Sequence, residues 1–498
     1  MGFSSDQELL PVLDGDVVTD GVKSYELVVI GGGPAGITAA ITASRLGKTV
    51  ALVDDHLEIG GAGVNTGTVP SKTLRETALA LSGFRSRNLY GVDLSLRREV
   101  TVPDFLGHQE HVRHAFHWSF TQQLEGLNAM MYHGRCSFLD AHTVQIGPVP
   151  EVGVKDAPVP DRQIQLHGEK ILIATASAPV HPDVFPFGEG AIYDSDTILT
   201  LARIPRTLAV IGAGVIGTEY GCTFRALGTE VHIVDGRDVL LPFLDAEISR
   251  ALAGALQRSG IEFHWKENVQ KCIPLEAGTV RLELSSGAVL TADAVLVAAG
   301  RQSNTAKLKL EKAGVTVGGR GIIPVNEHFQ TNLENIYAAG DVIGFPALYS
   351  TSAEQGRRAV HHSLGLGTSA LPALLPIGLY TIPEVSMVGE TEESLKQKGI
   401  AYLVGRARYR ENARGRIIGD QDGFLKLLFR QEDLKLIGVH IMGELATEVV
   451  HIGLVAMTCE ASANLFAGIC LNVPTLGTLY KNATLNALQT IPRSDQRA

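Results

Sequence analysis

Two groups of closely spaced glycines, each followed by an acidic residue, are the clearest chemical pattern in the chain. In chain order the residues are Gly31, Gly33, Gly36 and Asp54, and then Gly212, Gly214, Gly217 and Asp235. Glycines at this spacing let a backbone approach a phosphate, because no Cβ stands in the way. An acid about 20 residues further on accepts hydrogen bonds from ribose hydroxyls. The pattern therefore predicts two binding sites for dinucleotides.

Each glycine turn needs a strand before it and a helix after it. The apolar run Glu26–Ile30 predicts a buried strand, the next residues predict a helix ending near Gly47, and Thr49–Val53 predicts a second strand. Thr207–Ile211 and Glu230–Val234 repeat these strands around the second turn. The free N–H groups and the dipole at each helix N-terminus favour a pyrophosphate. Two such βαβ units favour FAD as electron carrier and NAD or NADP as hydride donor.

The second site carries opposing signals for the nicotinamide dinucleotide. Asp235 favours the free ribose hydroxyl of NAD, whereas Arg237 can meet the 2′-phosphate of NADP. Both cofactors are therefore expected to bind, and the preference stays open.

The length of 498 residues exceeds what one hydrophobic core supports, and about three domains are expected. The predicted fold is α/β, with two Rossmann-like dinucleotide-binding domains and a C-terminal α+β domain. The expected boundaries are a flexible extension at 1–24, an FAD-binding domain at 25–180 and 300–371, an NAD(P)-binding domain at 181–299, and an interface domain at 372–498.

The overall composition limits the possible partners. A net charge of −10 argues against nonspecific binding to nucleic acid or to an anionic membrane. The start of the chain lacks the pattern of a secretory signal, no apolar run is long enough to span a bilayer, and the five cysteines show no CxxC spacing. We expect a cytoplasmic protein whose cysteines are buried packing residues, Cys459 and Cys470 included.

One series of histidines has the residue type that binds metal ions. His108, His111, His114 and His117 recur every three residues in a helical stretch. Only Glu110 could complete a compact ligand set, and structural metal sites need a closed shell of four ligands. The sequence therefore predicts no metal.

Several motifs resemble those of the class I pyridine nucleotide–disulfide oxidoreductases, the family that includes dihydrolipoamide dehydrogenase, over about residues 25–490. The segment 60–72 aligns with the redox-active stretch of the family, GDVIG at 340–344 with its flavin-contacting aspartate, and ATASAP and GRQSNT with its two connecting motifs. The resemblance implies FAD contacts at Gly61, Thr68 and Asp341, and a nicotinamide dinucleotide contact at Gly300. It also implies a C-terminal dimerisation domain and a homodimer.

The chain departs from the family at the residues that handle thiols. The two redox cysteines of the family fall on Gly63 and Thr68, which cannot form a disulfide. The histidine and glutamate of the C-terminal His-Pro motif fall on Val473 and Thr478. Disulfide reduction by the usual route of the family is therefore not expected.

Within the family, stretches such as GAGVIGTEY (212–220) and GELATEVVHIG (443–453) are most similar to soluble pyridine nucleotide transhydrogenases. This resemblance implies an FAD-dependent oxidoreductase that moves hydride between NADPH or NADH and NAD or NADP in a ping-pong cycle. Two alternatives stay open: an NAD(P)H dehydrogenase that reduces a quinone or another small acceptor, and a nucleotide-binding flavoprotein sensor with little turnover.

The remaining catalytic candidates are Lys72 and Glu219. In the family these positions form an ion pair beside flavin N5, where a lysine stabilises an electron-rich ring. From sequence position alone, Lys72 would be interpreted as an ordinary surface lysine and Glu219 as an ordinary helix glutamate, neither with a catalytic role. The motif match favours the catalytic role.

Overall fold

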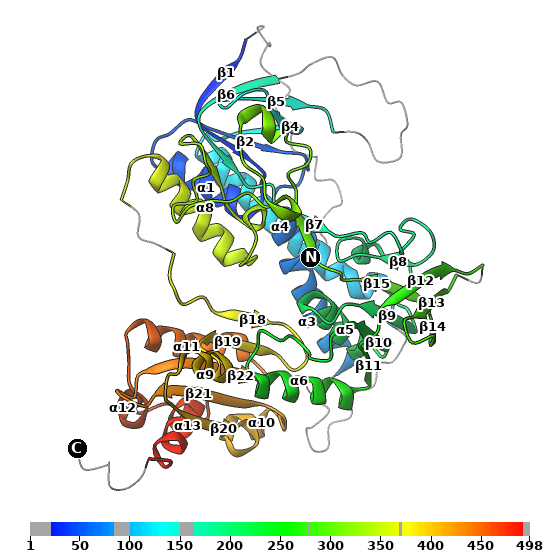
Figure 1. Cartoon of the computed structure of the whole chain (residues 1–498), viewed down its shortest axis with the longest axis vertical. Helices are drawn as coiled ribbons and strands as arrows, with labels where there is room; N and C mark the ends of the chain where they lie inside the picture. Colours follow the sequence, from blue (N-terminus) through cyan, green and yellow to red (C-terminus); the bar gives the residue numbers. More distant parts are fainter. Residues whose placement is uncertain (1–20, 84–99, 150–163, 277, 368–370, 492–498) are drawn as a thin grey trace, which may run out of the picture.

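The computed structural model describes residues 21–83, 100–149, 164–276, 278–367 and 371–491. Most of the extension expected at 1–24 lies outside these ranges. The described chain forms two α/β domains and a C-terminal α+β domain (Figure 1).

The first domain is built on a seven-stranded sheet. Its order is β3-β2-β1-β6-β5-β4, with β17 pairing to β6. The strands are β1 (Lys23–Ile30), β2 (Val50–Asp54), β3 (Met130–His133), β4 (Arg135–Phe138), β5 (Thr143–Gly147), β6 (Ile164–Ile173) and β17 (Ile336–Ala338). Strand β1 begins at Lys23, two residues inside the expected extension, because Lys23 and Ser24 continue the parallel ladder with β6.

Two helices of this domain pack closely against each other. They are α1 (Pro34–Arg45) and α8 (Tyr349–Ser363). A Cβ on Gly356 of α8 would lie 2.2 Å from the carbonyl oxygen of Ala35, so the glycine is what lets α8 approach α1.

The second domain carries a five-stranded parallel sheet of order β11-β10-β9-β15-β8. Its strands are β8 (Ile192–Tyr193), β9 (Thr207–Ile211), β10 (Glu230–Asp235), β11 (Ile261–Trp265) and β15 (Ala294–Val297). An antiparallel sheet adds β12 (Val269–Pro274), β13 (Val280–Leu284) and β14 (Val289–Ala292), and the helices are α5 (Val215–Ala226) and α6 (Ala246–Ser259). The paired strands β7 (Ser177–Pro179) and β16 (Arg301–Ser303) lie where the chain passes between the first two domains.

Helices from the first domain extend onto the second (Figure 1). They are α3 (Thr68–Ser82) and α4 (Val102–Gly126). The short helices α2 (Gly61–Val64) and α7 (Leu310–Ala313) also belong to the first domain. Phe105 of α4 and Phe224 of α5 meet edge to face with ring centroids 5.7 Å apart. Both belong to a hydrophobic core that also includes Leu74 of α3 and Leu379 of the C-terminal domain, so one core joins all three domains.

The C-terminal domain consists of a five-stranded antiparallel sheet and helices. The sheet order is β18-β19-β22-β21-β20, with strands β18 (Ile377–Leu379), β19 (Val385–Gly389), β20 (Tyr402–Arg408), β21 (Phe424–Arg430) and β22 (Leu436–Met442). The helices are α9 (Glu392–Lys398), α10 (Ala413–Ile417), α11 (Ala446–Thr458), α12 (Ala463–Gly468) and α13 (Thr478–Leu488).

A buried lysine links this domain to the second one. The ammonium of Lys426, 1% exposed, lies 2.7 Å from Asp245, 3.0 Å from Glu247 and 2.5 Å from Glu392. A buried charge needs such partners, because burial without them costs several kcal/mol.

Two expectations about the surface can be compared with the structure. Among the described residues, no helix is both long and apolar enough to cross a bilayer. The expected burial of all cysteines is wrong: Cys136 and Cys222 are buried and Cys272 is partly so, but Cys459 and Cys470 are exposed. Cys459 follows the end of α11 and Cys470 lies beyond α12, so neither is covered by the chain's own core.

Candidate functional site

The first glycine turn leaves no room for side chains on two of its glycines. A Cβ on Gly36 would lie 1.8 Å from the carbonyl oxygen of Gly31, and one on Gly31 would lie 2.3 Å from that of Ala174. At Gly33 the only neighbour of such a Cβ is the Cα of Gly61, at 3.8 Å. The turn is therefore tightly packed at Gly31 and Gly36 and leaves open space at Gly33. A pyrophosphate needs such an open position to come close to the backbone.

The second turn has the same construction. A Cβ on Gly217 would lie 2.0 Å from the Gly212 carbonyl oxygen, and one on Gly212 would lie 2.6 Å from that of Ala298. A Cβ on Gly214 would meet nothing within 4 Å.

The helices that follow both turns leave their first N–H groups uncapped by side chains. The N-cap residues are Gly33 for α1 and Gly214 for α5, and neither helix has a side-chain hydrogen bond at its cap. Both turns therefore pass the structural test for a dinucleotide: an open glycine position faces free N–H donors at the positive end of a helix dipole.

The two acids lie at the ends of β2 and β10, behind their turns. Asp54 accepts hydrogen bonds from the backbone N–H groups of Gly32 at 2.5 Å and His56 at 2.7 Å. Burial raises the pKa of Asp54, and these two donors only partly oppose the effect.

Asp235 is held by its arginine neighbour. Arg237 places Nε 2.8 Å from Oδ1 and Nη2 2.6 Å from Oδ2 of Asp235, and the N–H of Ala213 donates to the same carboxylate at 2.7 Å. Burial opposes ionisation of Asp235, yet these donors lower its pKa below the ordinary value. A cavity of about 220 Å³ lies beside Asp235 and is also lined by Gly212 and Glu267.

The remaining predicted contact residues lie around the junction of the domains. Gly61 has φ +54° and packs against Gly33, while Thr68 is the exposed first residue of α3. Asp341 follows β17 and accepts a hydrogen bond from Ser177 Oγ at 2.9 Å. Gly300 lies in an exposed turn before β16 with φ +107°, and a Cβ there would meet nothing.

Lys72 and Glu219 meet between the domains. Lys72 Nζ of α3 lies 2.6 Å from Glu219 Oε2 of α5, although 147 positions separate them in the chain. The Glu219 side chain is 8% exposed, and its other oxygen accepts the Tyr380 N–H at 2.8 Å. The ring of Tyr380 lies under the ammonium, with Nζ 5.0 Å from its centroid. The Glu219 carboxylate is thus fixed by two partners. Lys72 is held by the charge of Glu219 and by the ring of Tyr380.

Sequence reasoning missed two tyrosines at this site. Tyr380 directly follows β18, and nothing in the sequence around it indicates its contact with Lys72. Tyr349 has no sequence signal: it is the first residue of α8, and its ring lies 2.8 Å from where a Cβ on Gly63 would be. Pro34 closes the other side of that position at 2.7 Å.

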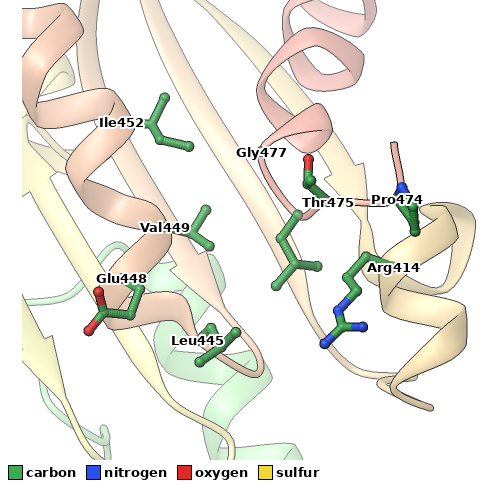
Figure 2. Close-up of a pocket in the computed structure, with 9 residues that line it drawn as sticks. Arg414, Leu445, Glu448, Val449, Ile452, Pro474, Thr475 and Gly477 are labelled. Atoms are coloured by element: carbon green, nitrogen blue, oxygen red, sulfur yellow. The ribbon is translucent and has the colours of Figure 1, made fainter. Parts of the chain in front are cut away.

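The two buried cysteines and the C-terminal motif do not supply the thiol chemistry of the family. Burial raises the pKa of the Cys136 and Cys222 thiols to about 12, so neither forms a thiolate near neutral pH. Val473, where the family has its histidine, is 66% exposed. It adjoins a pocket of about 320 Å³ lined by Glu448, Ile452 and Pro474 among others (Figure 2).

Comparison with known proteins identifies the family. The family model described as pyridine nucleotide-disulphide oxidoreductase matches residues 25–356, and the model for the dimerisation domain of these proteins matches residues 375–484. The chain therefore belongs to the pyridine nucleotide-disulphide oxidoreductases, as its motifs predicted, and the two Rossmann-like domains with a C-terminal dimerisation domain are confirmed.

Curated relatives match over nearly their whole length. The chain is 44% identical over 477 residues to the soluble pyridine nucleotide transhydrogenase of Mycobacterium tuberculosis (strain ATCC 25177 / H37Ra), covering 95% of this chain and 99% of the relative. It is 39% identical over 473 residues to the protein of the same name from Ectopseudomonas mendocina, covering 94% and 99%.

Solved structures agree in fold. The HOCl-induced flavoprotein disulfide reductase RclA from Escherichia coli matches with a TM-score of 0.82 and 26% identity, covering 93% of this chain and 99% of that one. LpdA from Mycobacterium tuberculosis matches with a TM-score of 0.83 and 26% identity at the same coverage.

Proposed function

We propose that the protein is an FAD-dependent transhydrogenase that moves hydride between NADPH or NADH and NAD or NADP. The observation that carries the proposal is the Lys72–Glu219 pair at the junction of two dinucleotide cradles, in a chain with no cysteine at either redox position of the family. The names of the relatives at 44% and 39% identity support the same activity.

The turn at Gly31, Gly33 and Gly36 would hold the FAD pyrophosphate, with Asp54 toward its ribose and Asp341 toward its ribityl chain. Gly61 and Thr68 would lie along the same cofactor. Bound FAD supplies a ring that accepts a hydride from one nicotinamide and returns it to another.

The second turn would hold the nicotinamide dinucleotide. Its glycines Gly212, Gly214 and Gly217 would meet the pyrophosphate, and Asp235 and Arg237 would meet the adenosine ribose. Gly300, with no side chain in an exposed turn, would leave space for the nicotinamide half. Donor and acceptor nucleotides would use this site in turn.

Lys72 would keep a positive charge beside the FAD ring. Glu219 positions that charge, and the N–H of Tyr380 positions Glu219. Because both partners are held before any nucleotide binds, little reorganisation is needed during transfer, which is how fixed charges contribute to catalysis.

The test is an anaerobic double mixing of the purified holoprotein. NADPH is added first while the flavin absorbance band is followed, and thio-NAD is added second. We expect the band to bleach and then recover as reduced thio-NAD forms at a catalytic rate. Bleaching that only a quinone or dye reverses would contradict transhydrogenation and favour the dehydrogenase alternative. Failure to bleach would favour the sensor alternative.

We also propose a homodimer formed through the C-terminal domain. This domain matches the dimerisation model of the family and exposes apolar side chains in one chain alone. Val473 is 66% exposed and Val455 is 63% exposed. Five free thiols suit a reducing compartment, and the cytoplasm is the location we propose.

A further inference from the structure

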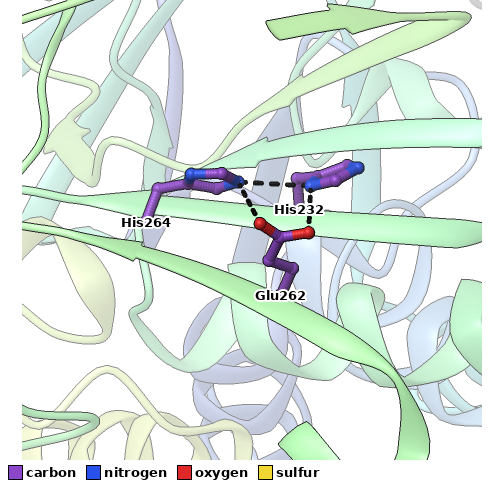
Figure 3. Close-up of side chains that lie close together, drawn as sticks. All are labelled: His232, Glu262 and His264. Atoms are coloured by element: carbon purple, nitrogen blue, oxygen red, sulfur yellow. Dashed lines mark hydrogen bonds and ion pairs between the residues drawn. The ribbon is translucent and has the colours of Figure 1, made fainter. Parts of the chain in front are cut away.

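We propose that His232, Glu262 and His264 form a binding site for a divalent transition-metal ion, with Zn²⁺ as the best match, on the second domain (Figure 3). The site is separate from both glycine turns and from the Lys72–Glu219 pair. It is also distinct from the histidine series of α4.

Strand pairing brings the three side chains together. In the parallel ladder between β10 and β11, His232 lies opposite Glu262 and Val234 lies opposite His264. Glu262 and His264 are two positions apart on one strand, so they share a face of the sheet. The three ligand groups therefore come from two neighbouring strands whose spacing is fixed by backbone hydrogen bonds.

The distances between the ligand atoms suit a small metal ion. His232 Nδ1 lies 3.2 Å from His264 Nε2 and 3.4 Å from one oxygen of Glu262, and His264 Nε2 lies 3.7 Å from the other oxygen. Zn²⁺ in a tetrahedral site binds nitrogen and oxygen at about 2.0–2.2 Å, which separates neighbouring ligand atoms by about 3.3–3.6 Å. Binding would need only small adjustments of these side chains.

A second carboxylate supports the first histidine. Glu230 Oε1 lies 3.4 Å from His232 Nε2, the ring nitrogen that points away from the cluster. Metal-binding histidines usually place their other nitrogen against a carboxylate, which fixes the tautomer and the ring orientation. Glu230 therefore presents His232 Nδ1 toward the ion.

The site is accessible on one side. His232 is 8% exposed, whereas the Glu262 side chain is 63% exposed. An ion can therefore enter from solvent and keep a water molecule as its fourth ligand. Two imidazoles and a carboxylate form a ligand set that Zn²⁺ accepts.

The other carboxylate-rich cluster of the described residues cannot serve this purpose. Asp245, Glu247 and Glu392 also approach one another, but the Lys426 ammonium already lies among them at 2.5–3.0 Å. Among the residues that the structure describes, no lysine or arginine forms an ion pair with Glu262, so in this cluster the metal would be the cation.

Metal binding would stabilise an edge strand of the sheet. β11 is the outer strand of its sheet, and the residues after it, Glu267 and Asn268, line the cavity beside Asp235. An ion that joins β10 to β11 would stabilise this edge of the nucleotide domain, because a ligand that binds only the folded form stabilises it.

The test uses the tag-free holoprotein, stripped with a chelator and titrated with Zn²⁺ by calorimetry. We expect one ion per chain and a rise in the melting temperature. His264→Ala should weaken binding more than about tenfold, and Glu230→Gln about 10- to 100-fold, as loss of a supporting carboxylate does. Glu262→Gln changes an exposed side chain, so it tests the ligand role without risk to folding.

The matched control is His111→Ala, which removes an exposed histidine of α4. It should leave Zn²⁺ affinity unchanged. Co²⁺ in place of Zn²⁺ should give the strong visible bands of a tetrahedral site, and these should disappear in His264→Ala. Absence of stoichiometric binding, binding that survives both His264→Ala and Glu262→Gln, or equal loss in His111→Ala would overturn the proposal.

Discussion

The ring of Tyr349 occupies the space that a side chain on residue 63 would need. A Cβ on Gly63 would lie 2.8 Å from Tyr349 Cδ2 and 3.0 Å from Cε2. These contacts are closer than packed carbon atoms allow. Glycine at the first redox position of the family is therefore matched by a large residue from α8, and restoring a thiol there would need a second change.

We expect Gly63→Cys to destabilise the holoprotein by about 1–3 kcal/mol, the usual cost of overpacking. Tyr349→Ala should reduce that cost when the two changes are combined, although the contact with Pro34 would remain. Denaturation of the wild type, both single variants and the double variant measures this coupling. An equal cost of Gly63→Cys with and without Tyr349 would show that the ring does not limit the site.

Lys72→Met should slow bleaching of the flavin band by NADPH by about 10²-fold, because the fixed positive charge is lost. It should also lower stability by about 1–3 kcal/mol, since the Glu219 carboxylate stays buried without its cation. Stopped-flow absorbance and denaturation measure the two effects.

The surface pair Lys48–Glu26, 2.7 Å apart and about a third exposed, is the matched control. Lys48→Met should have little effect on stability, because solvent screens an exposed pair, and it should leave the bleaching rate unchanged. Equal kinetic effects in the two lysine variants would contradict the role of Lys72.

Local patterns made the glycine turns predictable. Gly31 and Gly36 touch within a single turn, so spacing alone indicates the contact, and β9 spans Thr207–Ile211 as expected. The Lys72–Glu219 contact could be predicted only through the family motifs, because spacing says nothing about residues on helices of different domains.

Other contacts depend on tertiary packing alone. The His232–His264 contact depends on the register between β10 and β11, and a shift by one residue would send the two rings to opposite faces. Tyr349 reaches Gly63 because α8 packs on α1, a contact without a signal in either segment. The exposure of Cys459 could not be predicted, because composition cannot show which apolar faces the chain leaves uncovered.

Arg237→Ala should change the choice of nucleotide. The Arg237 guanidinium forms a bidentate ion pair with Asp235. When NADPH binds, the guanidinium could move from this carboxylate to the 2′-phosphate of the nucleotide. We expect kcat/KM for NADPH to fall about 10- to 100-fold relative to NADH, the effect of losing a charged hydrogen bond. Steady-state kinetics with both nucleotides measures the ratio, and Asp235→Asn should shift it the opposite way. A uniform loss for both nucleotides would contradict this role for Arg237.

The cluster around Lys426 should make the protein sensitive to acid. Burial opposes ionisation of Asp245, Glu247 and Glu392, yet Lys426 lowers the pKa of each below its ordinary value of 3.8 or 4.5, and Arg406 adds to this effect at Glu247. A lowered folded pKa contributes stability that is complete above the ordinary value and is lost as the pH falls through the folded value. We therefore expect the melting temperature to decrease below about pH 4.5.

Lys426→Met should remove much of this pH dependence and destabilise the protein by about 3–5 kcal/mol near neutral pH, because the buried carboxylates lose their shared cation. Burial would lower the pKa of Lys426, but its partners raise it above 10.5, so this contribution is lost only in strong alkali. Melting curves from pH 3 to pH 8 compare the variant with wild type. The same acid slope in both proteins would show that other groups control acid unfolding.

Two exposed valines of the C-terminal domain should control dimerisation. Val455 and Val473 are among its most exposed apolar side chains, and Val473 adjoins the pocket of Figure 2. Val455→Asp with Val473→Asp would bury charges in an apolar contact, so we expect a monomer by light scattering at micromolar concentration where wild type is a dimer. Val289→Asp, on the second domain at 53% exposure, is the matched control and should remain dimeric. A monomeric wild type would contradict the dimer itself. Dissociation of the Val289 variant would instead show that added charge alone separates the chains, and that the C-terminal face has no special part in holding them.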